Sequence, residues 1–191
     1  YKLRKKSIMS LTYSSMLDLN STLIEFDLPN AVSNNCFSSK NLDSKKPSLI
    51  MFICNHCPYV IHYHQQIQEL TKDFEEKFNF VAISSNDVEN YPQDSPEKMK
   101  ILWQELDLKF PYLYDETQEL AKKYKAECTP EFYLFNDNKK LVYRGRFDDT
   151  SPGSGRDPNG EDLRNAMQAL IDGQKISDDQ FPSMGCNIKW K

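Results

Sequence analysis

The sequence predicts a single α/β domain with a central mixed β-sheet flanked by helices, and three observations support this prediction. Residues 49–53 are a short apolar run bounded by polar residues, which is typical of a buried strand. From Tyr59 to Phe78 apolar residues recur at spacings of three and four, as in an amphipathic helix. Residues 80–84 form a second apolar run. Strand, helix and strand in this order make a right-handed parallel crossover.

Capping and turn residues predict the elements that follow. Residues 95–97 (Ser-Pro-Glu) have the types of an N-cap followed by proline at the first helical position, so we expect a helix to about Leu106. A short helix is expected over 116–124. Two apolar runs, 132–135 and 141–144, flank a polar turn and predict an antiparallel hairpin.

The last third of the chain combines a loop, a helix and a tail. Residues 148–160 are rich in glycine and proline and predict an exposed, mobile loop. A final helix is expected from Gly160 to about Ile171, with Gly173 as its C-terminal cap. The tail, 177–191, carries large apolar side chains, and we expect it to pack on the body of the protein.

The N-terminal part divides into two segments. Residues 23–36 alternate and then turn back, which predicts a β-hairpin extension ahead of the core fold. Residues 1–22 show little pattern and are interpreted as an N-terminal leader or a cloning remnant, poorly determined and either coil or short helix. The basic start is not followed by the ~7–15 apolar residues of a signal peptide, and Met9 is a plausible natural start. Residues 23–191 form one predicted domain, since no repeat or linker divides them.

Charge and composition exclude several kinds of partner. The net charge of −4 argues against nucleic acid or an anionic membrane as the main partner. No stretch approaches the ~20 apolar residues of a membrane span. Five cysteines, an odd number at irregular positions, do not resemble a secreted disulfide framework. We therefore expect a cytoplasmic protein, with the oligomeric state left open.

Cys54 and Cys57 lie at the predicted strand-to-helix junction, with their thiols near the helix N-terminus. There the unpaired N–H groups stabilise a thiolate, and a thiol pKa of ~8.5 falls by one to several units. A redox dithiol needs one thiolate to attack a disulfide and a second thiol to release the adduct. The alternatives are an inert buried pair or half of a zinc site, but structural zinc usually needs a second ligand pair. We predict no metal and no cofactor.

His56 lies between the two cysteines. A partly protonated imidazole beside a thiolate lowers the thiol pKa and makes the disulfide more oxidising. The alternative is an exposed turn residue without a role. His62 and His64 are separated by about 160° on a helix, so they do not serve one metal unless the helix is broken.

Several longer segments resemble a known family. Residues 52–60 (Phe-Ile-Cys-Asn-His-Cys-Pro-Tyr-Val), Cys128-Thr129-Pro130 and the C-terminal Gly-Cys-Asn-Ile-Lys-Trp-Lys are similar to bacterial thioredoxin-like proteins. These proteins are described as probable thiol-disulfide isomerases or as peroxiredoxin-like (AhpC/TSA-related). The resemblance covers about residues 23–191 and implies the thioredoxin-like fold. It also implies that Cys54 is the attacking thiolate and Cys57 the resolving thiol.

The resemblance further implies a substrate-binding face around Thr129. The Thr129-Pro130 bond resembles the cis proline that faces the active-site disulfide, and the Thr129 backbone would pair with an extended substrate segment. We expect Pro130 in contact with the cysteine pair. Asn55, which departs from the usual Gly or Pro, is expected to contribute to substrate binding and leaves the reduction potential open.

The remaining candidates are acidic or sulfur-containing. Alternation along the strand after Pro130 directs Glu131 to the interior under Cys57, where it would relay a proton to the resolving thiol. A surface acid at the strand edge is an equal alternative. For Cys128 a small buried residue is favoured over a third redox thiol. Structural roles are also favoured for Cys36 and Cys186.

Three functions compete. The leading prediction is a thiol-disulfide oxidoreductase that acts on protein or small-molecule disulfides together with a thiol electron donor or acceptor. A peroxiredoxin-like peroxidase is the second, although such a site needs Thr or Ser three residues before its cysteine, and only Arg144 and Arg146 could hold the peroxide. The third is a non-catalytic metal-binding module that uses Cys54, Cys57 and a histidine.

Overall fold

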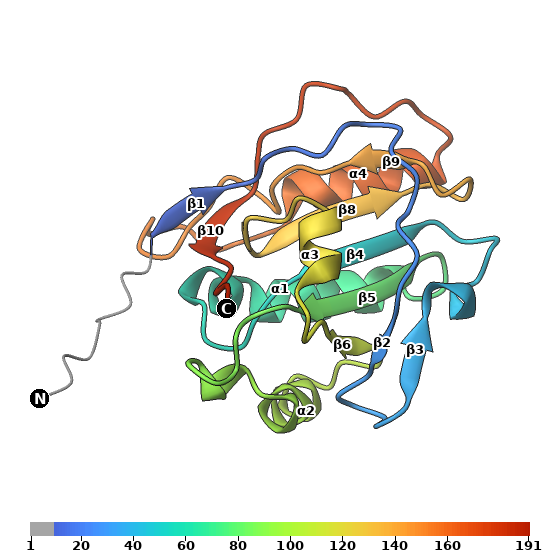
Figure 1. Cartoon of the computed structure of the whole chain (residues 1–191). Coiled ribbons are helices and arrows are strands. Elements are labelled where there is room, and N and C mark those ends of the chain that lie inside the picture. The colour runs from blue at the N-terminus through green and yellow to red at the C-terminus, as the bar shows by residue number, and fades with distance from the viewer. Residues whose placement is uncertain (1–9) are drawn as a thin grey trace, which may run out of the picture.

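The computed structural model describes residues 10–191 (Figure 1). The expectations for the basic start of the chain and for Met9 concern residues outside this range. The centre of the molecule is a five-stranded sheet in the order β6-β5-β4-β8-β9. Its strands, in chain order, are β4 (Ser48–Phe52), β5 (Asn79–Ser84), β6 (Tyr112–Tyr114), β8 (Glu131–Phe135) and β9 (Leu141–Tyr143).

The sheet is mixed, as the sequence predicts. Strand β4 pairs with β5 in parallel and with β8 antiparallel, and β5 pairs with β6 in parallel. Strands β8 and β9 form the expected antiparallel hairpin. Because β4 lies in the middle, the segment that follows it emerges from a strand that is buried along its whole length.

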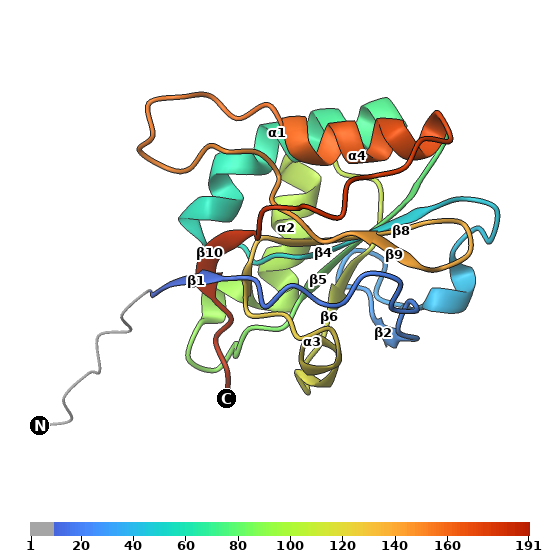
Figure 2. The same ribbon diagram turned by 90° about the horizontal axis from the view of Figure 1, so that it is seen from above.

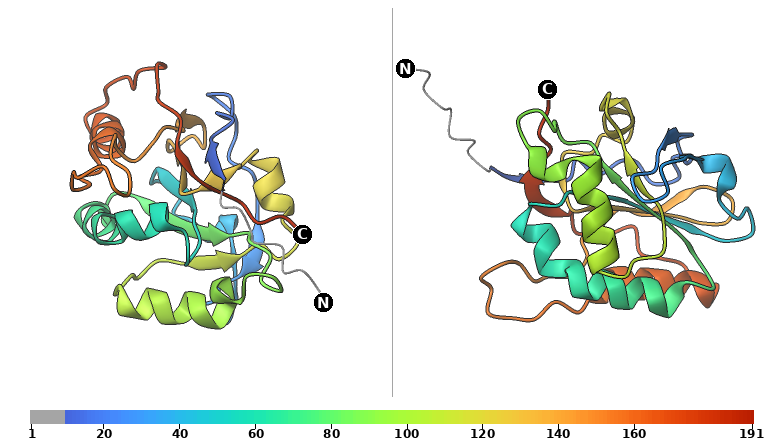
Figure 3. Two further views of the ribbon diagram at one scale, coloured as in Figure 1. Left: turned by 90° about the vertical axis from the view of Figure 1, so that its left-hand side faces the viewer. Right: turned by 90° about the horizontal axis from the view of Figure 1, so that it is seen from below.

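The two faces of the sheet are covered by different helices (Figures 2 and 3). Along β4, Leu49 and Met51 face one apolar cluster while Ile50 and Phe52 face the other, as the two-residue period of a strand requires. Helices α1, α2 and α4 cover the first face, and α3 covers the second. Their bounds are α1 (Pro58–Phe74), α2 (Pro96–Glu105), α3 (Glu119–Lys123) and α4 (Glu161–Ile171).

Helices α1 and α3 are shorter than predicted. Helix α1 ends at Phe74 rather than Phe78, and a turn follows in which the N–H groups of Lys77 and Phe78 both bond to Phe74 C=O. Helix α3 starts at Glu119 rather than 116, since Gln118 adopts a left-handed conformation that no helix continues. No helix within residues 10–191 is both long and apolar enough to cross a membrane.

Two small sheets flank the central one. The predicted N-terminal hairpin is present as β2 (Asp27–Pro29) and β3 (Cys36–Ser38), which pair antiparallel. The other small sheet has the order β1-β10-β7, with β1 (Leu11–Tyr13), β10 (Met184–Asn187) and β7 (Cys128–Thr129). The expected packed C-terminal tail is therefore confirmed, with β10 held between two strands.

The sheet that contains β1 corrects the prediction for residues 1–22. Leu11–Tyr13 pairs with β10, and Thr22 forms a bridge to Lys140. Leu17 is buried in the apolar cluster on the α3 face. Residues 10–22 are thus an integral part of the fold. Their apolar residues keep no sustained period, so the sequence gave no signal for a strand whose partner is more than 170 residues away.

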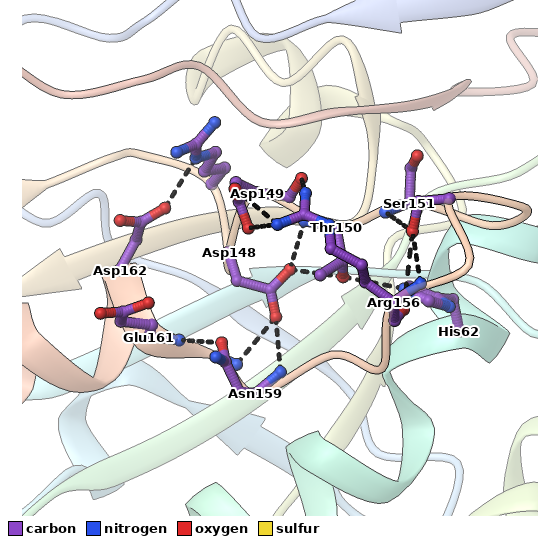
Figure 4. A network of polar contacts seen from close by, with 12 residues as sticks. His62, Asp148, Asp149, Thr150, Ser151, Arg156, Asn159, Glu161 and Asp162 are labelled. Atoms are coloured by element: carbon purple, nitrogen blue, oxygen red, sulfur yellow. Dashed lines mark hydrogen bonds and ion pairs between the residues drawn. The ribbon is translucent and has the colours of Figure 1, made fainter.

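The loop over 148–160 is exposed along most of its length, as expected, and is anchored at its start, while its mobility stays a prediction (Figure 4). Asp148 is buried and accepts bonds from the N–H groups of Asn159 and Gly160, at 2.8 Å each. It also accepts a bond from the Thr150 hydroxyl at 2.6 Å. Burial alone would raise the pKa of Asp148, but these bonds together lower it. One carboxylate thus closes both ends of the loop at the start of α4.

Candidate functional site

The Cys54–Cys57 turn lies where β4 ends and α1 begins, as predicted. Cys57 is the N-cap residue of α1, and Pro58 takes the first helical position, where its fixed φ suits the helix and its missing N–H is not needed. Both cysteines are buried, with 1% of Cys54 and 0% of Cys57 exposed. Neither sulfur is therefore open to solvent in this state of the protein.

Cys186 contacts Cys57, a contact that sequence reasoning missed. The two sulfurs are 2.7 Å apart, and the Cys57 sulfur lies 3.2 Å from the Thr129 carbonyl oxygen. Hydrogen bonding from Cys186 and then from Cys54 lowers the pKa of Cys57, outweighing its burial. The same contact raises the pKa of Cys186. Cys57 lies between the other two sulfurs, and their two thiols donate to it. The thiolate form of Cys57 is therefore stabilised.

Gly185 explains how β10 comes so close. A Cβ atom at this position would lie 1.9 Å from the Thr129 carbonyl oxygen, so only glycine permits the approach. In the antiparallel register Cys186 stands opposite Thr129. The backbone edge of Thr129 that we assigned to a substrate segment is therefore occupied by the protein's own C-terminal strand. The structural role expected for Cys186 is also too narrow, since its sulfur lies at the redox turn.

The Thr129-Pro130 bond is cis, as predicted. Thr129 contacts both cysteines: its hydroxyl lies 3.4 Å from the Cys54 sulfur, and its carbonyl oxygen lies 3.2 Å from the Cys57 sulfur. Pro130 lines a cavity of about 270 Å³ next to this loop, together with aromatic side chains such as Tyr63 and Phe147. The predicted direct contact of the Pro130 ring with the cysteine pair stays a prediction.

The Cys54 side of the turn is organised by Asp94, a residue that the sequence analysis did not single out. Asp94 lies at the end of η2 (Pro92–Asp94) and is completely buried. It accepts bonds from the Asn55 N–H at 2.8 Å, Asn86 Nδ2 at 2.9 Å and His56 Nδ1 at 2.6 Å. One carboxylate thus fixes three polar groups, two from the cysteine turn and one from the loop that holds Asn86. The polar loop was visible in the sequence, but nothing local distinguished Asp94 from its other acids.

Asn55 belongs to this scaffold rather than to a free substrate surface. Its side-chain amide donates to the Gln93 carbonyl at 3.0 Å, and its carbonyl oxygen accepts from the Tyr112 hydroxyl at 3.1 Å. With its N–H bonded to Asp94, the polar groups of Asn55 are used within the protein. These bonds give Asn55 a positioning role, and its contribution to substrate binding stays a prediction.

His56 is paired with an acid, which changes the electrostatic effect expected of it at Cys54. The His56 ring stacks on Tyr91 and pairs with the buried Asp94 carboxylate, so any positive charge on the imidazole is countered directly. Burial is the main cause that raises the pKa of Cys54, and the Asp94 charge raises it further. His56 is therefore neither idle nor an isolated cation. It is one half of an acid–histidine pair beside Cys54.

The C-terminal tail locks the same polar loop. Lys189 donates its N–H to Asn86 Oδ1 at 2.8 Å and accepts from the Asp87 N–H at 2.8 Å. Its ammonium group lies 5.6 Å from the centre of the Tyr91 ring. One segment, 184–191, therefore contacts both sides of the cysteine turn, through Cys186 on one side and Lys189 on the other.

Glu131 is interior, which excludes the alternative of a surface acid. It is completely buried, and one carboxylate oxygen accepts from the N–H groups of Glu127 at 2.8 Å and Cys128 at 3.2 Å. Within residues 10–191 the other oxygen has no hydrogen-bond partner. Burial raises the pKa of Glu131. The Cys128 sulfur lies 3.8 Å from Glu131, so the acid contacts Cys128, and a relay to Cys57 stays a prediction.

Cys128 and Cys36 differ in their surroundings. Cys128 is buried, and burial raises the pKa of its thiol, as suits the small buried residue that was favoured. Cys36 is exposed on β3, so it does not have the structural role that we expected. None of the five cysteines is in a disulfide.

The other histidines lie apart from the cysteine turn. His62 Nε2 is 2.9 Å from the Thr150 hydroxyl, at the anchored loop (Figure 4). His64 is largely buried, which lowers its pKa. Among the described residues one group has the geometry of a metal site: the ligand atoms of Cys54, His56 and Asp94 lie within 4.8 Å of one another. The histidine of this group is His56, and neither His62 nor His64 belongs to it.

The two arginines considered for a peroxidase are bonded elsewhere. Arg144 donates to the Leu17 carbonyl and to Gln180, each at 3.0 Å. Arg146 pairs with Asp162 at 2.6 Å and lies over the Phe181 ring. Neither of these arginine contacts is with a cysteine, so the geometry does not favour peroxide binding by Arg144 or Arg146.

The sheet order, the strand-to-helix dithiol turn and the cis proline together define an α/β protein with the thioredoxin-like fold. The Redoxin family model matches residues 19–162. The chain therefore belongs to the Redoxin family, a family of thiol redox proteins.

Solved structures agree with this assignment. An uncharacterized conserved protein from Geobacillus kaustophilus is 46% identical, with 96% of this chain and 97% of that chain covered and a TM-score of 0.93. A hypothetical protein from Sinorhizobium meliloti 1021 is 37% identical over 94% and 98%, with a TM-score of 0.91. A secreted disulfide oxidoreductase from Mycobacterium tuberculosis, 16% identical over 75% and 95% with a TM-score of 0.59, shares the fold. No curated protein matches the chain.

Proposed function

We propose that the protein is a thiol-disulfide oxidoreductase in which Cys54 and Cys57 alternate between a dithiol and a disulfide. The observation that carries the proposal is the sulfur cluster at the start of α1. There the thiolate is stabilised on Cys57, while Cys54 keeps its proton. Membership of the Redoxin family supports the same type of chemistry. The substrates would be protein or small-molecule disulfides, with a second thiol compound as electron donor or acceptor.

The reaction uses both cysteines in turn. The Cys57 thiolate takes the proton of Cys54, and the Cys54 thiolate then attacks a substrate disulfide to form a mixed disulfide and release one substrate thiolate. Cys57 gives its proton to that thiolate and attacks the Cys54 sulfur. The products are the Cys54–Cys57 disulfide and the second substrate thiolate. Because both sulfurs are buried, a substrate reaches Cys54 only when the segments that cover the turn move.

Single substitutions test the assignment. Cys54→Ser should strongly reduce turnover of insulin or a small disulfide, because serine is not a competent nucleophile for disulfides and only Cys57 is left at the turn to attack. Cys57→Ser should instead trap mixed disulfides at Cys54. Cys36→Ser is the matched control, since its thiol is exposed on β3, outside the cluster described above. Full activity in both cysteine variants of the turn would rule out the dithiol mechanism.

Metal binding is the second candidate, and the cluster of Cys54, His56 and Asp94 favours it. A sulfur, an imidazole nitrogen and a carboxylate oxygen suit zinc. The reduced protein should then bind Zn²⁺ in a stoichiometric titration, and Asp94→Asn should weaken that binding. Absence of zinc binding by the reduced protein removes this candidate and leaves the oxidoreductase unaffected.

A further inference from the structure

Cys186 lies within bonding reach of the redox turn although it is 129 residues from Cys57 in the sequence. The 2.7 Å between the two sulfurs exceeds the ~2.05 Å of a disulfide bond but is shorter than an ordinary nonbonded contact of ~3.5–4.0 Å. Cys186 is also buried, with 4% of its surface exposed. Only a small displacement of the two sulfurs therefore separates them from a covalent bond.

The fold holds Cys186 at this position from two sides. Strand β10 pairs with β1 on one edge and with β7 on the other, and Cys186 stands opposite Leu11 and Thr129. Gly185 has no Cβ atom and therefore lets the β10 backbone approach the Thr129 carbonyl. Two paired edges and one close approach fix the strand, so the contact of Cys186 with Cys57 is a property of the fold and not of a loose tail.

We propose that Cys186 is a third redox-active thiol, which forms a disulfide with Cys57 by exchange with the Cys54–Cys57 disulfide. This inference rests on the proposed function, because the oxidised Cys54–Cys57 pair is its reactant. Cys57 is the sulfur that both disulfides share, since it interacts with Cys54 and with Cys186.

The exchange is balanced without an external oxidant. Cys186 loses its proton and its thiolate attacks the Cys57 sulfur, so that the Cys57–Cys186 bond forms and the Cys54–Cys57 bond breaks. Cys54 leaves as a thiolate and takes up the proton. The protein stays at the same oxidation level. Cys54 is returned as a thiol, and β10 becomes covalently attached to the start of α1.

The exchange has a consequence for the Thr129 edge. In the reduced protein β10 occupies this edge by pairing alone. After the exchange a covalent bond holds it there, next to the Thr129 carbonyl that Cys57 faces. The oxidised state with the Cys57–Cys186 bond is therefore closed to a substrate strand at this edge until a thiol reduces it.

Disulfide mapping of the oxidised wild-type chain is the direct test. The chain is treated with oxidised glutathione, quenched in acid and digested with trypsin without reduction. Lys72 and Lys175 separate Cys57 from Cys186, so a link between these peptides reports the new disulfide. We expect linked and unlinked forms of the Cys54–Cys57 peptide together. Absence of any link to the Cys186 peptide overturns the proposal.

The Cys54→Ser variant isolates the second step. Oxidised glutathione should first form a mixed disulfide at Cys57, which Cys186 then resolves, releasing two glutathione thiols for each pair of protein thiols lost. Adding Cys186→Ser should stop the reaction at Cys57-bound glutathione, while adding Cys128→Ser should leave the link unchanged. Glutathione that stays on Cys57 with Cys186 present also contradicts the proposal.

The readouts separate this inference from the proposed function. Failure of the proposed function appears as unchanged turnover in the Cys54→Ser and Cys57→Ser variants. Failure of the inference appears only in the peptide map, with turnover still dependent on both cysteines.

Discussion

The two cysteines of the redox turn are equally buried but have opposite surroundings. Cys54 lies beside the Asp94 carboxylate and the Thr129 hydroxyl, and burial together with that charge raises its pKa. Cys57 lies beside the Cys186 thiol, which lowers its pKa. Burial alone would affect both thiols in the same direction. The difference between them therefore comes from their neighbours: Cys57 has the thiols of Cys186 and Cys54 beside it, whereas Cys54 has Cys57 and the Asp94 carboxylate.

The two sides are also built differently. The Cys57 side depends on a backbone approach, in which Gly185 brings a distant strand against Thr129. The Cys54 side depends on side-chain hydrogen bonds around a single buried acid, Asp94. Steric changes should therefore disturb the first side most, and changes of charge the second.

The largest effect is expected from Gly185→Ala. Its new Cβ would lie 1.9 Å from a backbone oxygen, which no side-chain rotation relieves. The cost should be about 3 kcal/mol, at the upper end of overpacking penalties, and Cys186 should move away from Cys57. Urea unfolding measures the stability, and the alkylation rate of Cys186 measures its exposure. Wild-type stability with a still protected Cys186 would show that β10 does not need the close approach.

Asp94→Asn should have the next largest effect. An amide in place of the carboxylate loses one acceptor, so one of its buried donors is left unpaired at a cost of about 1–3 kcal/mol. The pKa of Cys54 should fall at the same time, because the nearby negative charge is removed. Unfolding and thiol titration with an alkylating reagent measure the two effects. A higher pKa of Cys54 would contradict the assigned role of the Asp94 charge.

Glu131→Gln tests the buried acid through pH. Burial raises the pKa of Glu131 above the ordinary value of about 4.3. The folded state then binds the proton more tightly than the unfolded state, and this tighter binding adds to the free energy of unfolding. The added stability is fully present below pH ~4.3 and is lost as pH rises through the folded pKa. The variant should lack this decline in unfolding free energy. An identical pH profile for both proteins would show that Glu131 does not titrate abnormally.

His56→Phe should change the pKa of Cys54 in the opposite direction from Asp94→Asn, and its effect on stability should be smaller. Phenylalanine can keep the stacking on Tyr91 but leaves Asp94 without its imidazole partner. The pKa of Cys54 should rise, and the reduction potential against glutathione should fall, because the reduced form loses stabilisation. A potential that rises would mean that Asp94 is not the group through which His56 acts.

Cys36→Ser should have the smallest effect. The thiol is exposed on β3, and surface substitutions usually change stability by less than ~0.5 kcal/mol. Turnover, unfolding free energy and the peptide map should all match the wild type. A changed disulfide map would assign Cys36 a redox role outside the cluster.

The sequence by itself determined the central part of this protein. The strand of residues 48–52, the turn with Cys54 and Cys57, and the start of the helix at Pro58 are encoded by periodicity and by a proline at the first helical position. The hairpin of residues 131–143 is encoded in the same way. Such signals depend on residues a few positions apart, so they can be read without knowing how the chain folds back on itself.

Only the tertiary structure decided what surrounds the two thiols. Asp94 is 38 residues from His56, and Cys186 is 129 residues from Cys57. The first meets the turn because η2 follows β5, the parallel neighbour of β4, and the second because Gly185 fits against Thr129. A thiol pKa depends on charges and donors within a few ångströms, whatever their place in the sequence. The chemistry of the pair is therefore set by contacts that local sequence patterns do not contain.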